Sequence, residues 1–172
     1  MSARYRVRQG LRALGTWLHP ADDTLARQHL SPALFALFEQ MRRSERQHSL
    51  RVLNELIASG HDQPDLLAAA LLHDVGKIHA PFSLPEKVLA VLVKAISTGL
   101  YRRWGTGSSR GWRRPFAVSA QHPAWGADMV AEAGGTPLTV ELIRRHADTF
   151  DGPAQTEADR LLLVLQAVDG RN

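Results

Sequence analysis

Hydrophobic residues recur at spacings of three and four along most of the chain, which is the period of a helix that buries one face. No alternating strand pattern of useful length occurs. Prolines fit the first turn of a helix, so each marks an expected start. We expect helices to begin at Pro32, Pro64, Pro85, Pro123 and Pro137. Two more starts are expected from side-chain caps, one at a capping box formed by Ser44 and Gln47 and one at Thr156 together with Asp159. The pattern therefore predicts an all-α fold.

Ionisable side chains interrupt the apolar faces of these helices. Asp74 follows Leu67 and Leu71 on one face, and Asp169 follows Leu165 at a spacing of four. A carboxylate that points into a core is costly unless it is paired or bound to a metal ion. The two aspartates therefore predict a cationic centre inside the protein.

Four histidines accompany these aspartates in an ordered series. The series is His48, His73, Asp74, His122, His146 and Asp169. Successive histidine and aspartate positions are separated by 25 (48 to 73), 24 (122 to 146) and 23 (146 to 169) residues, about one helix-turn-helix unit each. One histidine on an apolar face is more often an ordinary core residue. The whole series instead predicts ligands for two metal ions, whereas His19, His29 and His61 lie near turns or polar segments and are interpreted as incidental.

The motifs around these residues resemble a known family. Residues 71–78 read Leu-Leu-His-Asp-Val-Gly-Lys-Ile, and residues 121–127 contain His-Pro-x-x-Gly-Ala. Residues 143–146 end in a further histidine and residues 164–169 in a final aspartate. Over about residues 44–170 this order resembles the two-metal branch of the HD-domain superfamily of metal-dependent phosphohydrolases. The resemblance implies a helical bundle with the metal site between its central helices.

The resemblance also implies roles for individual residues. His48, His73, Asp74 and Asp169 would hold a first metal ion, and Asp74 would bridge to a second ion held by His122 and His146. Lys77 would face the phosphate of the substrate or a metal-bound oxygen, which makes Asp74 and Lys77 the predicted catalytic residues. Without the motif, Lys77 would be interpreted as a solvated lysine after a helix end. Imidazole and carboxylate ligands suit divalent Fe, Mn, Co, Ni, Zn or Mg without selecting one of them.

One branch of the superfamily does not match. HD-GYP domains carry a double histidine followed by Glu, then Asp-Gly and Gly-Tyr-Pro. Residues 146–153 read His-Ala-Asp-Thr-Phe-Asp-Gly-Pro, so Ala147 stands at the second histidine and Gly-Tyr-Pro is missing. Neither a third metal ion nor specificity for cyclic di-GMP is therefore expected.

Positive charge is concentrated in one part of the chain. Residues 87–127 contain no Asp or Glu and carry a charge of +7, whereas the whole chain carries +4 and the remainder −3. Within this part we predict a flexible basic loop at residues 99–115, whose arginines bind the substrate: Arg102, Arg103, Arg110, Arg113 and Arg114. Arginine can clamp a phosphate and tryptophan can stack on a base. A solvated loop, and a loop that binds nucleic acid or an anionic membrane, are the competing interpretations, with nucleic acid not favoured.

Length and composition set the remaining expectations. The 172 residues suit an N-terminal helical extension over residues 1–30 and one catalytic domain over residues 31–172. The chain has no Cys, which excludes disulfides and thiolate ligands and favours the cytoplasm. No apolar run approaches the ~20 residues of a membrane span. Residues 11–18 predict a short amphipathic helix that packs on the domain or, less favoured, lies on a membrane surface.

Besides binding of nucleic acid through the basic loop, three functions compete. The first is hydrolysis of a small phosphorylated substrate by a metal-activated water, with a nucleotide as the leading candidate. The second is oxygenation, because the resemblance extends to di-iron oxygenases of the same fold with a very similar ligand set. The third is a metal-containing module that binds or signals without catalysis. The phosphohydrolase is the favoured interpretation.

Overall fold

The computed structural model describes residues 23–80, 83–149 and 153–172, and all regular structure in these ranges is helical. In chain order the elements are α2 (Thr24–His29), α3 (Pro32–Gln40), α4 (Arg43–Ala58), α5 (Pro64–Leu72), the 3₁₀ helix η2 (Val75–Ile78), α6 (Leu84–Ile96), α7 (Thr98–Gly105), the 3₁₀ helix η3 (Gly111–Arg113), α8 (Arg114–Glu132), α9 (Pro137–Arg145) and α10 (Glu157–Asp169). The predicted all-α class is confirmed. None of the described helices has the length and apolar character needed to cross a bilayer.

Most of the helices surround one apolar core. Helix α5 lies at its centre, and all residues from Leu66 to Leu72 are buried. Phe38 from α3, Leu53 from α4 and Leu162 from α10 are fully buried against the same core. Full burial of one such side chain stabilises the folded state by about 1.5–3 kcal/mol. This core fixes the ends of α5, α9 and α10 relative to one another.

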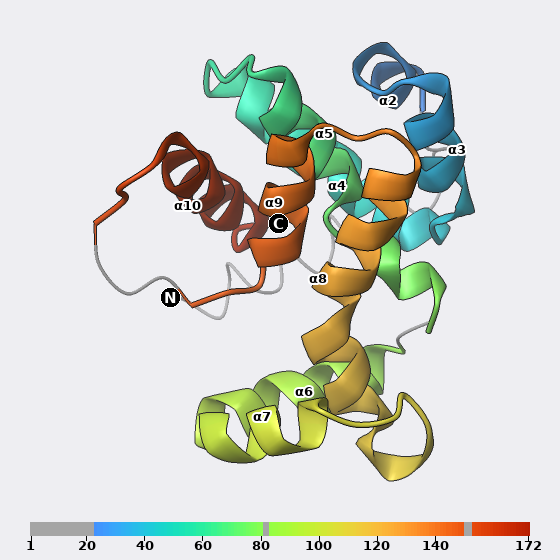
Figure 1. The fold of residues 1–172 in the computed structure, drawn as a ribbon, viewed down its shortest axis with the longest axis vertical. Coiled ribbons are helices and arrows are strands. Elements are labelled where there is room, and N and C mark those ends of the chain that lie inside the picture. The colour runs from blue at the N-terminus through green and yellow to red at the C-terminus, as the bar shows by residue number, and fades with distance from the viewer. Residues whose placement is uncertain (1–22, 81–82, 150–152) are drawn as a thin grey trace, which may run out of the picture.

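A second, smaller lobe projects from this body at the bottom of Figure 1. It consists of α6, α7, η3 and the first part of α8, and we call residues 84–118 the α6–α7 lobe. Its own apolar cluster contains Ala90, Tyr101, Phe116 and Val118. Helix α8 runs from the lobe into the main body, so a single continuous helix connects the two parts.

The prediction of a flexible loop at residues 99–115 is wrong for most of that segment. Helix α7 occupies its first part, and η3 leads directly into α8, which leaves only residues 106–110 as a connection. The Trp104 ring packs on Phe116 at 5.0 Å between centroids, and the Tyr101 hydroxyl donates to Ser119 Oγ at 2.8 Å. These contacts with α8 stabilise a helix in a stretch whose glycines suggest a loop.

The helix starts confirm some predictions and correct others. Pro32, Pro64, Pro85 and Pro137 lie in first turns, and Thr156 caps α10 as expected. The capping box predicted for Ser44 and Gln47 is wrong, because the Glu45 carboxylate accepts the Arg42 backbone N–H at 3.3 Å and α4 begins earlier. Pro123 does not open a helix but lies inside α8.

The predicted N-terminal extension is described only in part. Residues 1–22, including the helix expected at residues 11–18, lie outside the described residues. Ala26 in α2 is buried, and so is Leu30, the residue that follows the end of α2. Both belong to the main core, so this part of the extension is packed on the domain.

Candidate metal centre

The fold brings the six predicted ligand residues together. His73 and His146 directly follow the last residues of α5 and α9, Asp74 precedes η2, and Asp169 ends α10. His48 and His122 project from the interiors of α4 and α8. The six form two groups of three, His48 with His73 and Asp169, and Asp74 with His122 and His146, and within each group the ligand atoms lie within 4.8 Å of one another.

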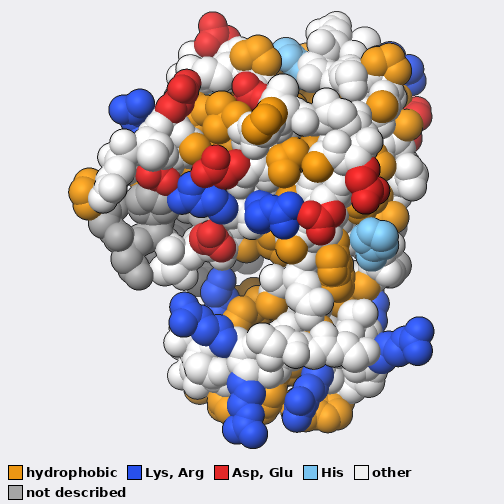
Figure 2. All heavy atoms as spheres, viewed as in Figure 1, with side chains coloured by type: hydrophobic (Ala, Val, Ile, Leu, Met, Phe, Trp, Pro, Cys, Tyr) orange, Lys and Arg blue, Asp and Glu red, His pale blue; other side chains and the backbone are white. Residues whose placement is uncertain are grey.

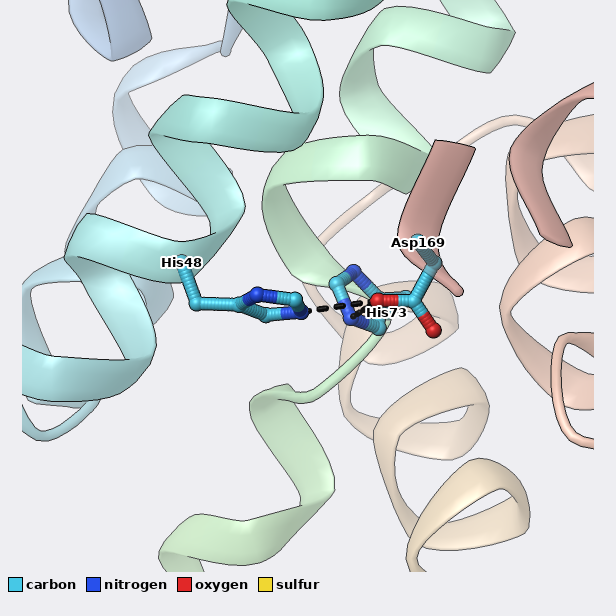
Figure 3. A group of neighbouring side chains, drawn as sticks. All are labelled: His48, His73 and Asp169. Carbon is cyan, nitrogen blue, oxygen red and sulfur yellow. Dashed lines mark hydrogen bonds and ion pairs between the residues drawn. The ribbon is translucent and has the colours of Figure 1, made fainter. Parts of the chain in front are cut away.

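The first group joins the N-terminal and C-terminal parts of the domain. Figure 3 shows its side chains pointing toward one another from α4, the end of α5 and the end of α10. Asp169 Oδ1 lies 2.8 Å from His48 Nε2 and 3.6 Å from His73 Nε2. Burial raises the pKa of Asp169, but the hydrogen bond with His48 and the charge of His73 outweigh it and hold that pKa below its ordinary value. Asp169 is therefore anionic at neutral pH, as a metal ligand would need to be.

Asp74 faces both groups with different oxygens. Oδ1 lies 3.4 Å from His122 Nε2 and 3.9 Å from His146 Nε2, whereas Oδ2 lies 3.7 Å from His73 Nε2. Burial raises the pKa of Asp74, but the nearby His73, Lys77 and His122 together lower it well below its ordinary value. A buried carboxylate that presents one oxygen to each group has the geometry of a bridging ligand.

Backbone carbonyls orient the three most buried imidazoles. The Nδ1 atoms lie at hydrogen-bond distance from carbonyls of their own helices: His73 from Ala70 at 3.0 Å, His122 from Val118 at 3.0 Å and His146 from Ile143 at 2.7 Å. A carbonyl oxygen can only accept, so we assign the proton of each neutral ring to Nδ1. Each Nε2 then presents a lone pair to the centre, which is the arrangement of histidines that bind metal ions.

The Nε2 atoms of His122 and His146 face each other at 3.2 Å. Burial, and then the charges of His73 and His122, lower the pKa of His146 to about 3. His146 is therefore neutral near pH 7, and two neutral rings with this orientation would place two lone pairs in contact. A cation held between the two Nε2 atoms removes the repulsion. The donor set thus fits a bound metal ion.

Pro123 contributes to the position of His122. A proline inside a helix has no N–H, so the carbonyl four residues earlier, that of Ser119, loses its usual donor. His122 Nδ1 lies 3.1 Å from the Ser119 oxygen and 3.0 Å from the Val118 oxygen. The imidazole thereby takes the place of the missing backbone donor. This explains why the His-Pro pair is compatible with the interior of α8.

Two glycines allow η2 to lie directly against α8. A Cβ atom on Gly76 would lie 2.0 Å from the His122 carbonyl oxygen and 2.6 Å from the Gly126 nitrogen. No side chain fits this gap, and a Cβ on Gly126 would in turn lie 3.0 Å from the Gly76 nitrogen. Close backbone contact here keeps Asp74, two residues before Gly76, beside His122. The glycines of both sequence motifs therefore serve the geometry of the centre.

Comparison with protein families agrees with this geometry. The model of the HD domain matches residues 46–170, well over half of the chain. The chain belongs to the HD-domain family. This family has an all-α fold and lies within a superfamily of metal-dependent hydrolases. Comparisons with curated proteins and with solved structures gave no match.

A cavity of about 600 Å³ opens over the candidate metal centre of the HD domain. Its wall contains Ser44, Glu45, His48, Arg51, Asp74, Lys77, Lys87, His122, His146, Ala147, Asp169 and Asn172. Lys77 forms an ion pair with Asp74 Oδ2, so the predicted catalytic lysine lies at the centre. Burial, and then the charge of Lys77, lower the pKa of Lys87. The cavity thus carries cations beside its ligand residues.

Sequence reasoning missed two of these cations. Arg51 lies three residues after His48 on α4. Residues at this spacing lie on the same face of a helix, so the sequence could have indicated that Arg51 faces the same site as His48. Lys87 comes from α6 and reaches the cavity only because the lobe folds back toward the centre, which no local pattern in the sequence shows.

The arginines predicted to bind substrate have a different place in the HD domain. None of Arg102, Arg103, Arg110, Arg113 and Arg114 is part of the cavity wall. Arg114 forms an ion pair with Glu86, and the Arg113 guanidinium lies over the Trp112 ring at 5.0 Å from its centroid. Substrate binding by these arginines stays a prediction.

Proposed function

We propose that this HD-domain protein is a metal-dependent phosphohydrolase that cleaves a phosphoester or phosphoanhydride by means of a metal-activated water. The main support is the ligand set: three buried imidazoles are held with Nε2 toward the centre, and the two oxygens of Asp74 face different groups. His48, His73 and Asp169 would hold one divalent ion, His122 and His146 a second, and Asp74 both. Bound ions would act as Lewis acids and lower the pKa of a bound water.

The chain supplies the rest of the site through its cations. Lys77, Lys87 and Arg51 all line the cavity. Lysine binds a phosphate as a point charge and arginine through its paired N–H donors, so the three can hold and orient an anionic substrate. The volume of about 600 Å³ lies within the range of small-molecule sites, which supports a substrate as large as a nucleotide.

These cations favour hydrolysis over the competing functions. An oxygenase acting on a neutral polyol has no need for several positive side chains beside the metal centre, whereas a phosphate substrate does. Purified protein that contains iron and consumes dioxygen would support the oxygenase instead. An occupied metal centre with no turnover of any phosphoester would support a module that binds without catalysis.

Metal content tests the proposal most directly. Protein purified without added metal should contain about two divalent ions per chain, and a His122→Ala, His146→Ala double variant about one. His61→Ala, a histidine outside both groups, is the matched control and should resemble the wild type. The wild type should hydrolyse bis(p-nitrophenyl) phosphate, and the double variant should not.

Two results would contradict parts of the proposal. One ion in both proteins would remove His122 and His146 from the ligand set. No ion in either, even after reconstitution with Mn or Fe, would contradict metal-dependent catalysis as a whole.

A further inference from the structure

Helix α6 turns an apolar face to the solvent. Val91, Leu92 and Ile96 are 66%, 53% and 83% exposed, and Val88 is also largely exposed. Val91 and Leu92 lie three and four residues after Val88, and Ile96 lies four residues after Leu92, so these positions form one continuous stripe on the helix. A surface helix ordinarily buries such a stripe. We call these four residues the α6 stripe.

The stripe is not needed to fold the lobe. The opposite side of α6 packs through Ala90 against the cluster that contains Tyr101 and Phe116. Lys94 on α6 reaches toward the main body, where its Nζ lies 3.5 Å from the Ala147 carbonyl oxygen. An apolar surface left over after folding, and continuous along a helix, is typical of an interaction site.

The lobe that carries the stripe also exposes basic residues. Arg102, Arg103, Arg110 and Arg113 are exposed in the same lobe, and Trp112 is 63% exposed beside them. Figure 2 shows Lys and Arg side chains over the lower lobe with no Asp or Glu among them on the face drawn. The sequence agrees, since residues 87–127 carry +7 and no acidic residue. The natural partner of this surface is therefore both apolar and negatively charged.

Three other partners for this surface are less favourable: a second copy of the lobe, the N-terminal segment of the same chain and nucleic acid. A second copy of the lobe would bring two strongly positive surfaces together, which is unfavourable. Residues 1–22 carry four arginines and one aspartate, a net charge of 4 − 1 = +3, so charge does not favour this segment as the partner. Nucleic acid would satisfy the arginines but leave the aliphatic side chains of the stripe without a role.

We infer that the α6–α7 lobe docks on an anionic lipid membrane. The α6 stripe enters the boundary between headgroups and acyl chains, Trp112 lies at the level of the headgroups, and the arginines contact the anionic headgroups. Charge and apolar area act together, so neither alone gives full binding. This docking is independent of the proposed hydrolysis and places the protein at a membrane surface without a spanning helix.

Vesicle flotation of the full chain tests the inference. Vesicles of equal parts phosphatidylcholine and phosphatidylglycerol should bind the wild type, and vesicles of phosphatidylcholine alone should not. A Val91→Gln, Leu92→Gln, Ile96→Gln variant should lose binding by about tenfold or more while its hydrolysis of a soluble substrate is unchanged. Ile57→Gln with Leu163→Gln removes exposed apolar side chains elsewhere and is the matched control.

The outcomes separate the candidate partners. Failure of the wild type to float, or equal flotation of the triple variant, would overturn the inference. Salt-sensitive binding of a DNA duplex by both proteins, without flotation, would assign the surface to nucleic acid. A wild-type dimer that the triple variant disrupts, without flotation, would assign it to a second copy. Flotation does not require metal, so loss of the metal centre leaves this test unaffected.

Discussion

Folded proteins usually bury apolar side chains and expose polar ones, and the candidate metal centre and the α6–α7 lobe are opposite exceptions to this rule. In the centre, His73, Asp74 and His122 are buried although they are polar. In the lobe, Leu92 and Ile96 are exposed although they are apolar. Buried polar groups and exposed apolar patches are the two informative exceptions in a folded protein. Each region is therefore a candidate for function, and the main apolar core supplies stability.

The two regions also differ in how firmly the fold fixes them. The candidate ligands come from α4, α8 and α10 and from the ends of α5 and α9, and backbone carbonyls hold three of the imidazoles. The lobe depends on a much smaller apolar cluster and is joined to the body mainly through α8. Lys87 is the exception because it lies in the lobe and lines the cavity. Changes elsewhere in one region should leave the function of the other intact.

The largest expected effect follows from Asp74→Asn. This change removes the only charge shared by both ligand groups, and even changes outside the ligand shell weaken metal affinity by ~10–100-fold. We expect hydrolysis to fall by more than about 100-fold and both ions to be lost, as measured by phosphoester turnover and elemental analysis. Asp128→Asn, on the exposed side of α8, is the matched control. Vesicle binding that fell together with activity would show that the two regions are coupled.

A pair of glycine substitutions compares the packing of the two regions. Gly76→Ala forces a Cβ into the backbone of α8, so the free energy of unfolding should fall by about 3 kcal/mol. Gly99→Ala in the lobe meets no atom closer than 4.0 Å and should raise it by up to about 1 kcal/mol. Denaturant unfolding of both variants measures the difference. Equal values would contradict the close approach of η2 to α8.

Lys87 and Lys94 test the contact between the lobe and the cavity. Both lie on α6, but only Lys87 lines the cavity. Lys87→Gln should raise the KM for a phosphorylated substrate about tenfold with little change in kcat, because one charge-assisted contact to the substrate is lost. Lys94→Gln should leave both constants near those of the wild type. A fall in kcat alone would place Lys87 at the reacting phosphate.

The sequence predicted the two regions unequally well for physical reasons. The ligand residues lie at helix ends or on apolar faces, where a local pattern shows an unusual polar group, and the fold brings all six together. The interior position of Pro123 was not predictable because it depends on the imidazole of His122 as a substitute donor. Helix α7 was missed because Trp104 is stabilised by Phe116, a contact beyond the reach of local composition.

The smallest effect concerns the anchoring of α10, which carries Asp169. A hydrogen bond from Arg145, with further bonds from Thr156 and the backbone, lowers the pKa of Asp159 to about 2. The ordinary value is 3.8, so between these values the unfolded chain binds more protons than the folded one. The stabilisation is therefore complete above about pH 4 and is lost as the pH falls toward 2. For metal-free protein at pH 6, the free energy of unfolding should be lower for Asp159→Asn than for the wild type. The difference between the two free energies should become smaller as the pH falls from about 4 toward 2. Asp62→Asn, an exposed aspartate before α5, is the matched control, and a gap that stays constant with pH would mean that the Arg145 contact does not set the pKa.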